Sequence, residues 1–141
     1  MTLRLSEGTI GEIRREGERA YPAECCGVLV GRPGEIKDVF HCIPALNRRT
    51  DDPHRYLISP SDLQRTEQEV RRAGLEVLGF YHSHPDHPAV PSAFDAEHAW
   101  PWYSYIILRV DRGRAAEVSS WQLADDRSAM IPESVEVFSE V

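Results

Sequence analysis

The sequence predicts one domain of the α/β (or α+β) class, in which helices sandwich a single mixed β-sheet. Segments with helical periodicity bracket short apolar runs, the arrangement expected of a layered domain. The chain has 141 residues, 41% hydrophobic and 28% charged, which is typical of a globular domain with its own core. No repeat, low-complexity tract or linker divides it, so we treat residues 1–141 as a single domain.

The first half of the chain predicts a helix followed by two strands. Residues 6–21 have apolar side chains on one face and charges on the others, and Pro22 ends this helical pattern. The apolar run Cys25–Val30 suits a buried strand. The turn sequence GRPGE then leads into a second strand at Ile36–Ile43.

The second half begins with a polar loop, Asn47–His54, and a short strand, Tyr56–Ile58. Ser61 opens a segment with capping-box spacing after a proline, which predicts a helix that Gly74 closes. Further strands are predicted at Val77–His82, Tyr103–Val110, Val118–Leu123 and Val135–Phe138. Helices therefore bracket the central strands, as the fold class requires.

Composition excludes several classes of function. No apolar run approaches the ~20 residues that cross a bilayer, and the N-terminus MTLRLSEGTI is too polar for a signal peptide, so we expect a cytoplasmic protein without a membrane partner. Three cysteines, two of them adjacent, suit a reducing compartment. The net charge is −7 and the basic residues are scattered, which argues against a nucleic-acid partner.

The stretch GFYHSHPDHPAVPSAFD concentrates metal-binding residue types. If the strand that begins at Val77 continues to His84, then His82 and His84 point to the same side, because side chains alternate along a strand. Two imidazoles at a strand end provide half of a zinc site, and a catalytic zinc needs one more protein ligand. A pair of surface histidines with no metal is the alternative reading.

Asp95 is the candidate third ligand. The chain leaves the strand through PDHPAVP and then enters a helix at Ser92, which places Asp95 in the first turn. Prolines lower the entropic cost of holding the loop in one shape, so it could return that turn to the strand end. Ser92 and Asp95 could also form a simple helix cap, which is compatible with metal binding.

Other polar residues nearby offer rival assignments. His87 and His98 could be ligands, but His87 lies within the loop and His98 behind Asp95, so we expect surface or supporting roles for both. His82 to His87 also spells HxHxDH, the signature of the metallo-β-lactamase fold. That fold needs further histidine ligands downstream, and no histidine follows His98.

The spacing resembles a different family. HSHP, followed by H-x7-S-x-x-D from His84 to Asp95, resembles the motif of the JAMM (MPN+) zinc metalloproteases. The segment YPAECCGVLVG supplies Glu24 where that family has a glutamate, and Tyr56 with Ser59–Leu63 resembles the entry to its second helix. The resemblance runs from about residue 5 to residue 123. It implies the MPN fold, with a mixed sheet of the cytidine-deaminase-like type.

The resemblance also implies roles for individual residues. His82, His84 and Asp95 would bind one Zn²⁺ per chain, with water as the fourth ligand. Glu24 would be the general base that takes a proton from the water and gives it to the leaving amine. Ser92 would orient the water or stabilise the oxyanion. The choice of Glu24 over other glutamates rests on the resemblance alone.

The implied substrate is a ubiquitin-like sulfur-carrier protein ending in Gly-Gly, cut after the second glycine. The segment between Asp95 and Tyr103 is too short for the insertions with which large eukaryotic members grip ubiquitin, so the chain is similar to the compact prokaryotic members. A deubiquitinase-like or general small-peptide metallohydrolase is one alternative, and a non-catalytic MPN scaffold with structural zinc is another. The oligomeric state stays open, a homodimer included.

Two further pairs of residues have uncertain roles in the sequence. Cys25 and Cys26 could include a nucleophile or an extra ligand, but adjacent strand residues face opposite ways, and we expect small apolar residues that pack a buried strand. Trp100 and Trp102 follow the ligand helix and either line a substrate groove or pack the core.

Overall fold

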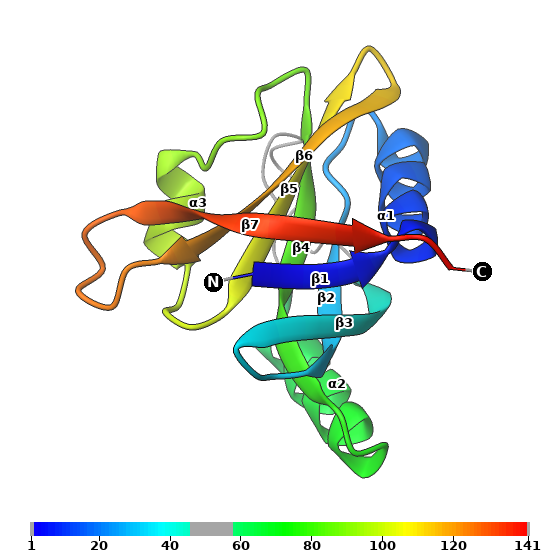
Figure 1. Ribbon diagram of the computed structural model, residues 1–141. Helices are drawn as coiled ribbons and strands as arrows, with labels where there is room; N and C mark the ends of the chain where they lie inside the picture. Colours follow the sequence, from blue (N-terminus) through cyan, green and yellow to red (C-terminus); the bar gives the residue numbers. More distant parts are fainter. Residues whose placement is uncertain (1, 46–57, 141) are drawn as a thin grey trace.

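Among residues 2–45 and 58–140, which the computed structural model describes, seven strands close into a barrel and three helices pack against it (Figure 1). The strands are β1 (Thr2–Ser6), β2 (Cys26–Arg32), β3 (Ile36–Ala45), β4 (Glu76–Pro85), β5 (Ser104–Asp111), β6 (Arg114–Leu123) and β7 (Met130–Phe138). The helices are α1 (Glu7–Ala20), α2 (Pro60–Arg72) and α3 (Ala93–His98). The predicted mixed α/β class is confirmed.

The sheet is mixed in strand direction, and it closes on itself. Its order is β1-β3-β2-β4-β5-β6-β7, and β1 pairs in parallel with both β3 and β7. β2 pairs antiparallel with β3 and β4, whereas β4 and β5 are parallel. Closure goes beyond the single open sheet expected between helices, and it depends on the first strand of the chain.

β1 is the element that the sequence analysis missed. Leu3 and Leu5 are fully buried, whereas Arg4 between them turns outward to carboxylates of Asp38 and Glu136, each 3.4 Å away. This alternation is that of a strand with one buried face. Five residues carry only two apolar positions, so the pattern is too short to identify the strand without its distant partners.

α1 occupies almost the predicted residues and faces the main core. Its N-cap is Ser6, whose Oγ accepts a hydrogen bond from a first-turn backbone N–H, and Ile10 and Ile13 lie on its buried face. Gly17 lies on the same face, where a Cβ would come within 2.5 Å of the side chain of Leu108. Glycine therefore lets the helix approach β5 closely.

α2 starts two residues earlier than predicted. The N-cap is Ser59, whose Oγ accepts a hydrogen bond from Asp62 N at 3.1 Å, and Pro60 occupies the first turn. The expected cap at Ser61 is therefore wrong, because proline fits the first turn, where its missing N–H costs nothing. The predicted polar loop and the short strand at Tyr56–Ile58 lie outside the described residues except for Ile58, which is not in a strand.

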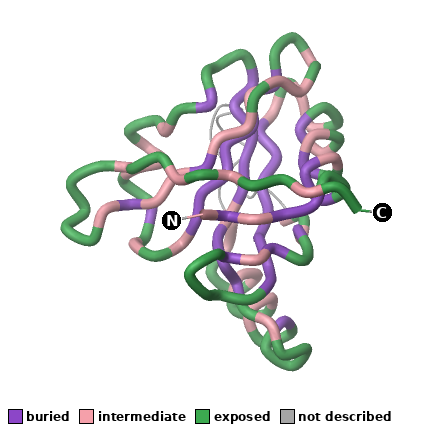
Figure 2. The backbone as a smooth tube through the Cα atoms, in the orientation of Figure 1, coloured by how far each residue is buried: buried purple, intermediate pink, exposed green. Residues whose placement is uncertain are grey.

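Buried residues gather in the central strands and leave the loops exposed (Figure 2). The main core combines side chains of α1 with those of strands β1 to β5. A second, smaller core lies between α2 and strands β2 and β4; its buried members are Val28, Val30, Val70 and Val77. None of the helices in the described part of the chain is long and apolar enough to span a membrane.

A register between β2 and β4 determines what meets at one end of the barrel. Cys26, the first residue of β2, lies opposite His82. The pairing continues into the residues that precede β2. Cys25 N donates to Ser83 Oγ at 2.8 Å, and Ser83 N donates to Cys25 O at 3.1 Å. Extending this register by one residue places Glu24 opposite His84.

A buried lysine holds the connection from α3 to β5. Lys37 is 1% exposed, and its Nζ donates to the carbonyl of Trp102 and to Ser104 Oγ. The same ammonium lies 4.4 Å from the centroid of the Trp102 ring, and burial lowers the pKa of Lys37. Trp102 has a positive φ of 80°, which is unusual for a bulky residue, and these contacts hold it there.

Replacing Leu5 by alanine is expected to lower the free energy of unfolding by about 2–5 kcal/mol, because it removes a fully buried side chain from the strand that closes the barrel. The matched control is Val137→Ala: Val137 is the β7 partner of Leu5 but is 45% exposed, so its loss should cost under about 1 kcal/mol. Urea unfolding of both variants makes the comparison. Equal losses would contradict this account of the closure.

Ser83→Ala is expected to lower the free energy of unfolding by about 1–3 kcal/mol, because the buried N–H of Cys25 loses its acceptor. Amide hydrogen exchange should show faster exchange at Cys25 than in the wild type, with less change in β6. If the Cys25 amide exchanges as slowly as in the wild type, the Ser83 hydroxyl does not stabilise the pairing of Cys25 with Ser83.

Candidate active site

The end of β4 carries two buried histidines on one side of the strand. His82 is 1% exposed and His84 is 8% exposed, and their Nε2 atoms lie 3.0 Å apart. The single residue between them, Ser83, points the other way and bonds to β2. The alternation predicted from the sequence is therefore the geometry that brings the two imidazoles together.

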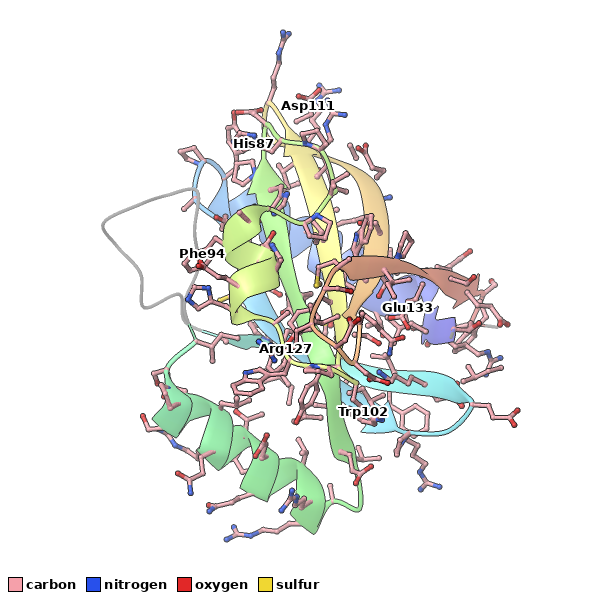
Figure 3. All side chains as sticks on the ribbon, turned by 90° about the vertical axis from the view of Figure 1, so that its left-hand side faces the viewer. His87, Phe94, Trp102, Asp111, Arg127 and Glu133 are labelled. Carbon is pink, nitrogen blue, oxygen red and sulfur yellow. The ribbon has the colours of Figure 1, made fainter. Side chains whose placement is uncertain are left out.

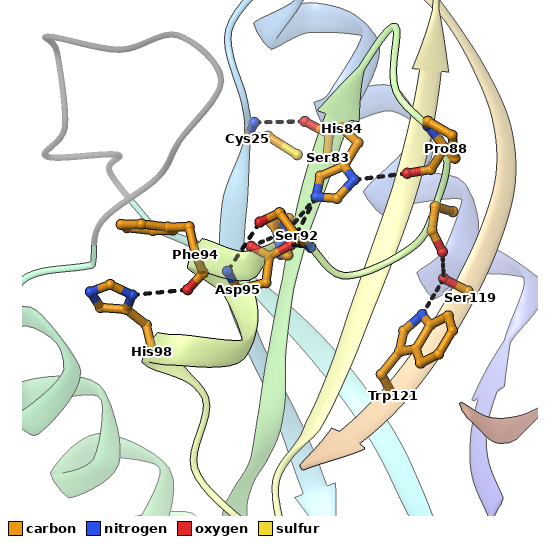
Figure 4. A network of polar contacts seen from close by, with 12 residues as sticks. Cys25, Ser83, His84, Pro88, Ser92, Phe94, Asp95, His98, Ser119 and Trp121 are labelled. Atoms are coloured by element: carbon orange, nitrogen blue, oxygen red, sulfur yellow. Dashed lines mark hydrogen bonds and ion pairs between the residues drawn. The ribbon is translucent and has the colours of Figure 1, made fainter. Parts of the chain in front are cut away.

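α3 adds a carboxylate to the pair (Figure 4). Asp95 Oδ1 lies 3.2 Å from His82 Nε2, and Asp95 Oδ2 lies 3.1 Å from His84 Nε2. A capping box holds the aspartate: Ser92 Oγ accepts from Asp95 N at 3.1 Å, and Ser92 N donates to Asp95 Oδ2 at 2.9 Å. Asp95 is thus both the N3 residue of the capping box, whose N-cap is Ser92, and the candidate ligand.

A backbone carbonyl selects the tautomer of His84. Its Nδ1 lies 2.8 Å from Pro88 O, and since a carbonyl oxygen only accepts, Nδ1 must carry the proton. Nε2 of a neutral His84 then presents a lone pair toward Asp95 Oδ2, which is also an acceptor. Two acceptors 3.1 Å apart need a cation or a proton between them.

Protonation preferences fit a cation at this point. Burial lowers the pKa of His82 and outweighs the opposing contact with Asp95. Burial acts to raise the pKa of Asp95, but the close imidazoles of His82 and His84 outweigh it and hold that pKa well below its usual range. A neutral His82 beside an ionised carboxylate is the form that binds a metal.

The distances among these three groups suit zinc. Ligand atoms about 2.0–2.1 Å from a tetrahedral Zn²⁺ are about 3.3 Å from one another. The two Nε2 atoms lie 3.0 Å apart, Asp95 Oδ1 lies 3.2 Å from His82 Nε2, and Asp95 Oδ2 lies 3.1 Å from His84 Nε2. The donor set of two imidazole nitrogens and a carboxylate is one that zinc accepts, so these residues fit the ion.

Glu24 belongs to the same cluster of metal-binding residue types as the two histidines. It is 4% exposed at the start of β2, and one of its oxygens lies within 4.8 Å of ligand nitrogens of His82 and His84. The Asp95 oxygens lie 3.1 and 3.2 Å from the same histidines. The structure therefore places two carboxylates, Asp95 and Glu24, around the imidazoles.

The remaining polar residues of the loop make other contacts. Asp86 accepts hydrogen bonds from Tyr21 OH at 2.6 Å and from Arg112 N at 2.8 Å, so it joins three surface segments. His98 donates from Nδ1 to Phe94 O at 2.9 Å and stacks on the Phe94 ring. The HxHxDH reading, which would use Asp86 as a ligand, has no support in this geometry.

The adjacent cysteines are packed into the fold. Cys25 belongs to the main core, and Cys26 Sγ lies 3.7 Å from Ala45 O. Burial raises the pKa of Cys25 to about 11 and that of Cys26 to about 12. Both thiols are therefore protonated near neutral pH, which makes them poor nucleophiles and ligands.

An apolar groove of about 390 Å³ opens beside Asp95. Its lining residues come from the start of α2, from α3 and from the central strands: Ile58, Pro60, Leu63, Phe80, Phe94, Asp95, His98, Trp100 and Tyr105. Figure 3 looks onto this side of the molecule, with Phe94 projecting from α3. The two tryptophans differ: Trp100, 63% exposed, lines the groove, whereas Trp102 packs on Lys37.

Sequence reasoning missed several supporting residues. Pro88 acts through its carbonyl, which carries no side-chain signal, and Ser83 acts through a register that is visible only once β2 and β4 are paired. The aromatic groove residues Phe80 and Tyr105 belong to strands that the apolar pattern did identify. Which face of those strands meets α3 could not be known beforehand.

The sequence is similar to proteins of several prokaryotes. One is a desampylase of Haloferax volcanii, 38% identical over 99 residues, which are 69% of this chain and 70% of the relative. Another is a probable TtuB-protein conjugate cleaving protease of Thermus thermophilus, 33% identical over 115 residues, which are 82% and 75% of the two chains.

Solved structures agree with the fold. A Desulfitobacterium hafniense protein matches with a TM-score of 0.85 at 27% identity, covering 99% of this chain and 94% of that one. A JAB1/MPN domain protein of Archaeoglobus fulgidus shares the fold alone, with a TM-score of 0.58 at 18% identity over 94% of this chain and 98% of that one. The family described as prokaryotic homologs of the JAB domain matches residues 6–124. This match confirms the resemblance inferred from the HSHP motif, and the chain belongs to the prokaryotic JAB domain family.

Proposed function

We propose that this protein is a zinc-dependent isopeptidase that hydrolyses the bond after a C-terminal Gly-Gly of a ubiquitin-like sulfur-carrier protein. The observation that carries the proposal is the convergence of His82, His84 and Asp95, with the carboxylate of Glu24 beside them. The names of the relatives support the substrate class, since one is a desampylase and the other a protease that cleaves protein conjugates.

His82, His84 and Asp95 are the residues that would hold the zinc ion. When bound, the ion would supply Lewis acidity, which polarises the scissile carbonyl and lowers the pKa of water. The chain's own part is to hold the three ligands in place. The Pro88 carbonyl orients His84, and the capping box orients Asp95.

Glu24 is proposed as the general base and then the general acid. In amide hydrolysis the water oxygen bonds to the carbonyl carbon, the C–N bond breaks, and one proton must reach the departing nitrogen. A buried carboxylate close to the histidines can accept that proton from water and deliver it to the amine. Such proton transfer typically contributes 10²–10⁴-fold to the rate.

Ser92 is proposed to stabilise the developing oxyanion. Its Oγ already accepts a hydrogen bond from Asp95 N, so its own hydroxyl hydrogen remains to be donated. The side chain lines a hollow next to His84. A hydroxyl that donates toward the reacting carbonyl would stabilise negative charge on its oxygen.

The apolar groove beside Asp95 would receive the carrier tail. β4 is paired with β2 on one side and β5 on the other, so a tail cannot join it as an added strand. Side-chain contacts along the groove would hold the residues before the glycines instead. The glycine pair has no side chains, so it would pass close to the metal ligands without a clash.

Metal analysis tests the ligand set. The purified wild type is expected to carry about one zinc per chain, and His84→Ala and Asp95→Ala are expected to lose it, because each removes one of three convergent donors. His98→Ala is the control, since its imidazole contacts Phe94 and should leave zinc content unchanged. Full zinc occupancy in His84→Ala by elemental analysis would refute the assignment.

Substitution of Glu24 by glutamine tests the mechanism separately from binding. Glu24→Gln keeps the shape but cannot accept a proton, so it should retain zinc and still bind a Gly-Gly carrier conjugate, while kcat falls by about 10²-fold or more. Mass spectrometry should locate the wild-type cut after the second glycine.

A carrier whose last glycine is replaced by leucine provides the matching substrate control. Wild-type protein should fail to cut it, because a leucine side chain would meet the walls beside the ligands. Near-normal turnover by Glu24→Gln would show that another residue is the general base. If the leucine carrier is cut as fast as the glycine carrier, the proposed Gly-Gly specificity is wrong. If the protein unfolds when zinc is removed and cuts neither carrier, the alternative of a non-catalytic scaffold with structural zinc is favoured.

A further inference from the structure

A second hollow, of about 450 Å³, shares Phe94 as a wall with the apolar groove. We call it the proline-loop pocket; its lining residues are His84, Pro85, His87, Pro88, Val90, Pro91, Ser92, Ala93 and Phe94. We propose that this pocket binds the leaving group, the lysine side chain of the protein to which the carrier is attached. The inference rests on the proposed isopeptidase function and assigns the two hollows to the two sides of the scissile bond.

The candidate ligands lie between the two hollows. Asp95 lines the apolar groove, whereas His84 and Ser92 line the proline-loop pocket, and Phe94 borders both. A carbonyl carbon placed at the ligand cluster therefore has both hollows within reach. In this proposal the acyl part of the substrate lies in one of them and the amine part in the other.

The walls of the proline-loop pocket are fixed before any ligand binds. Asp86, with a positive φ of 57°, ties the start of the loop to Tyr21 and Arg112. Farther along, Pro88 O accepts from His84, and Ala89 O accepts from a serine hydroxyl on β6. A loop held at three points and stiffened by prolines forms a preformed binding site rather than a mobile cover.

The shape and chemistry of the pocket suit a lysine side chain. In an isopeptide the amide nitrogen is followed by four methylenes, which need a short apolar passage, and then by a polar backbone. Pro88, Pro91 and Val90 provide hydrocarbon walls, and Val90 is 54% exposed at the surface. His87, labelled in Figure 3, adds an imidazole to the lining.

The acyl side has less need of a pocket this close to the ligands. Its last two residues are glycines, so the first side chain of the carrier tail lies about 7–10 Å from the scissile carbon. The apolar groove, whose lining residues run from Asp95 to Trp100 and the start of α2, provides walls for that side chain. The pocket that adjoins His84 and Ser92 is therefore left for the amine side.

The test compares two leaving groups on one carrier. A sulfur-carrier protein ending in Gly-Gly is linked either to the lysine side chain of a small folded protein or to methylamine, which reaches into neither hollow. For Val90→Trp, which narrows the proline-loop pocket, the ratio of kcat/KM for the lysine conjugate to that for the methylamide should fall at least tenfold. For Trp100→Ala, which opens the apolar groove, the same ratio should stay within about twofold of the wild type, whatever the individual rates.

Ala93→Leu provides a second way to narrow the pocket, since Ala93 lines it from the exposed start of α3. This variant is used instead of Val90→Trp if Val90→Trp does not bind zinc or does not show the circular dichroism spectrum of the folded wild type. An unchanged ratio in a folded, zinc-loaded pocket variant overturns the assignment of the leaving group. A ratio that falls in Trp100→Ala instead reverses the two sides. Wild-type protein that cuts neither substrate refutes the proposed function itself, which is a separate result.

Discussion

The candidate site depends on the antiparallel register between β2 and β4. With Cys26 opposite His82, the two hydrogen bonds between Cys25 and Ser83 extend the pairing just far enough to bring Glu24 beside His84. A shift of one residue would turn both histidines toward the opposite face, because side chains alternate along a strand. The serine between the histidines therefore matters as much to the geometry as the imidazoles do.

A short helix completes the arrangement with very few residues. α3 has only six residues, too few for stability by itself, and its first turn is held by the same Asp95 that contacts the histidines. Cap hydrogen bonds hold the carboxylate in place beside the histidines, so helix formation and ligand placement depend on one another. The loop before it contributes through carbonyls, with Pro88 O on His84 as the clearest case.

The sequence was most informative where local rules act. Period-two alternation put His82 and His84 on one side, and cap spacing put Asp95 in a first turn; the structure shows both. Glu24 was singled out only through the family resemblance, since its place depends on pairing between distant strands. Barrel closure was not foreseen for the same reason: β1 is recognisable by its pairing with β3 and β7, while its own five residues hold only two buried leucines.

Those closing strands also affect where the boundaries of the domain are drawn. The family match covers residues 6–124, yet β1 lies almost wholly before that range and β7, at Met130–Phe138, lies after it. A recombinant fragment trimmed to the shared segment would retain all five candidate site residues but expose unpaired edges on β3 and β6. Unpaired strand edges template aggregation. Insolubility of such a fragment would thus reflect the loss of β1 and β7, the strands that close the barrel. It would say nothing about the chemistry at His82 and His84.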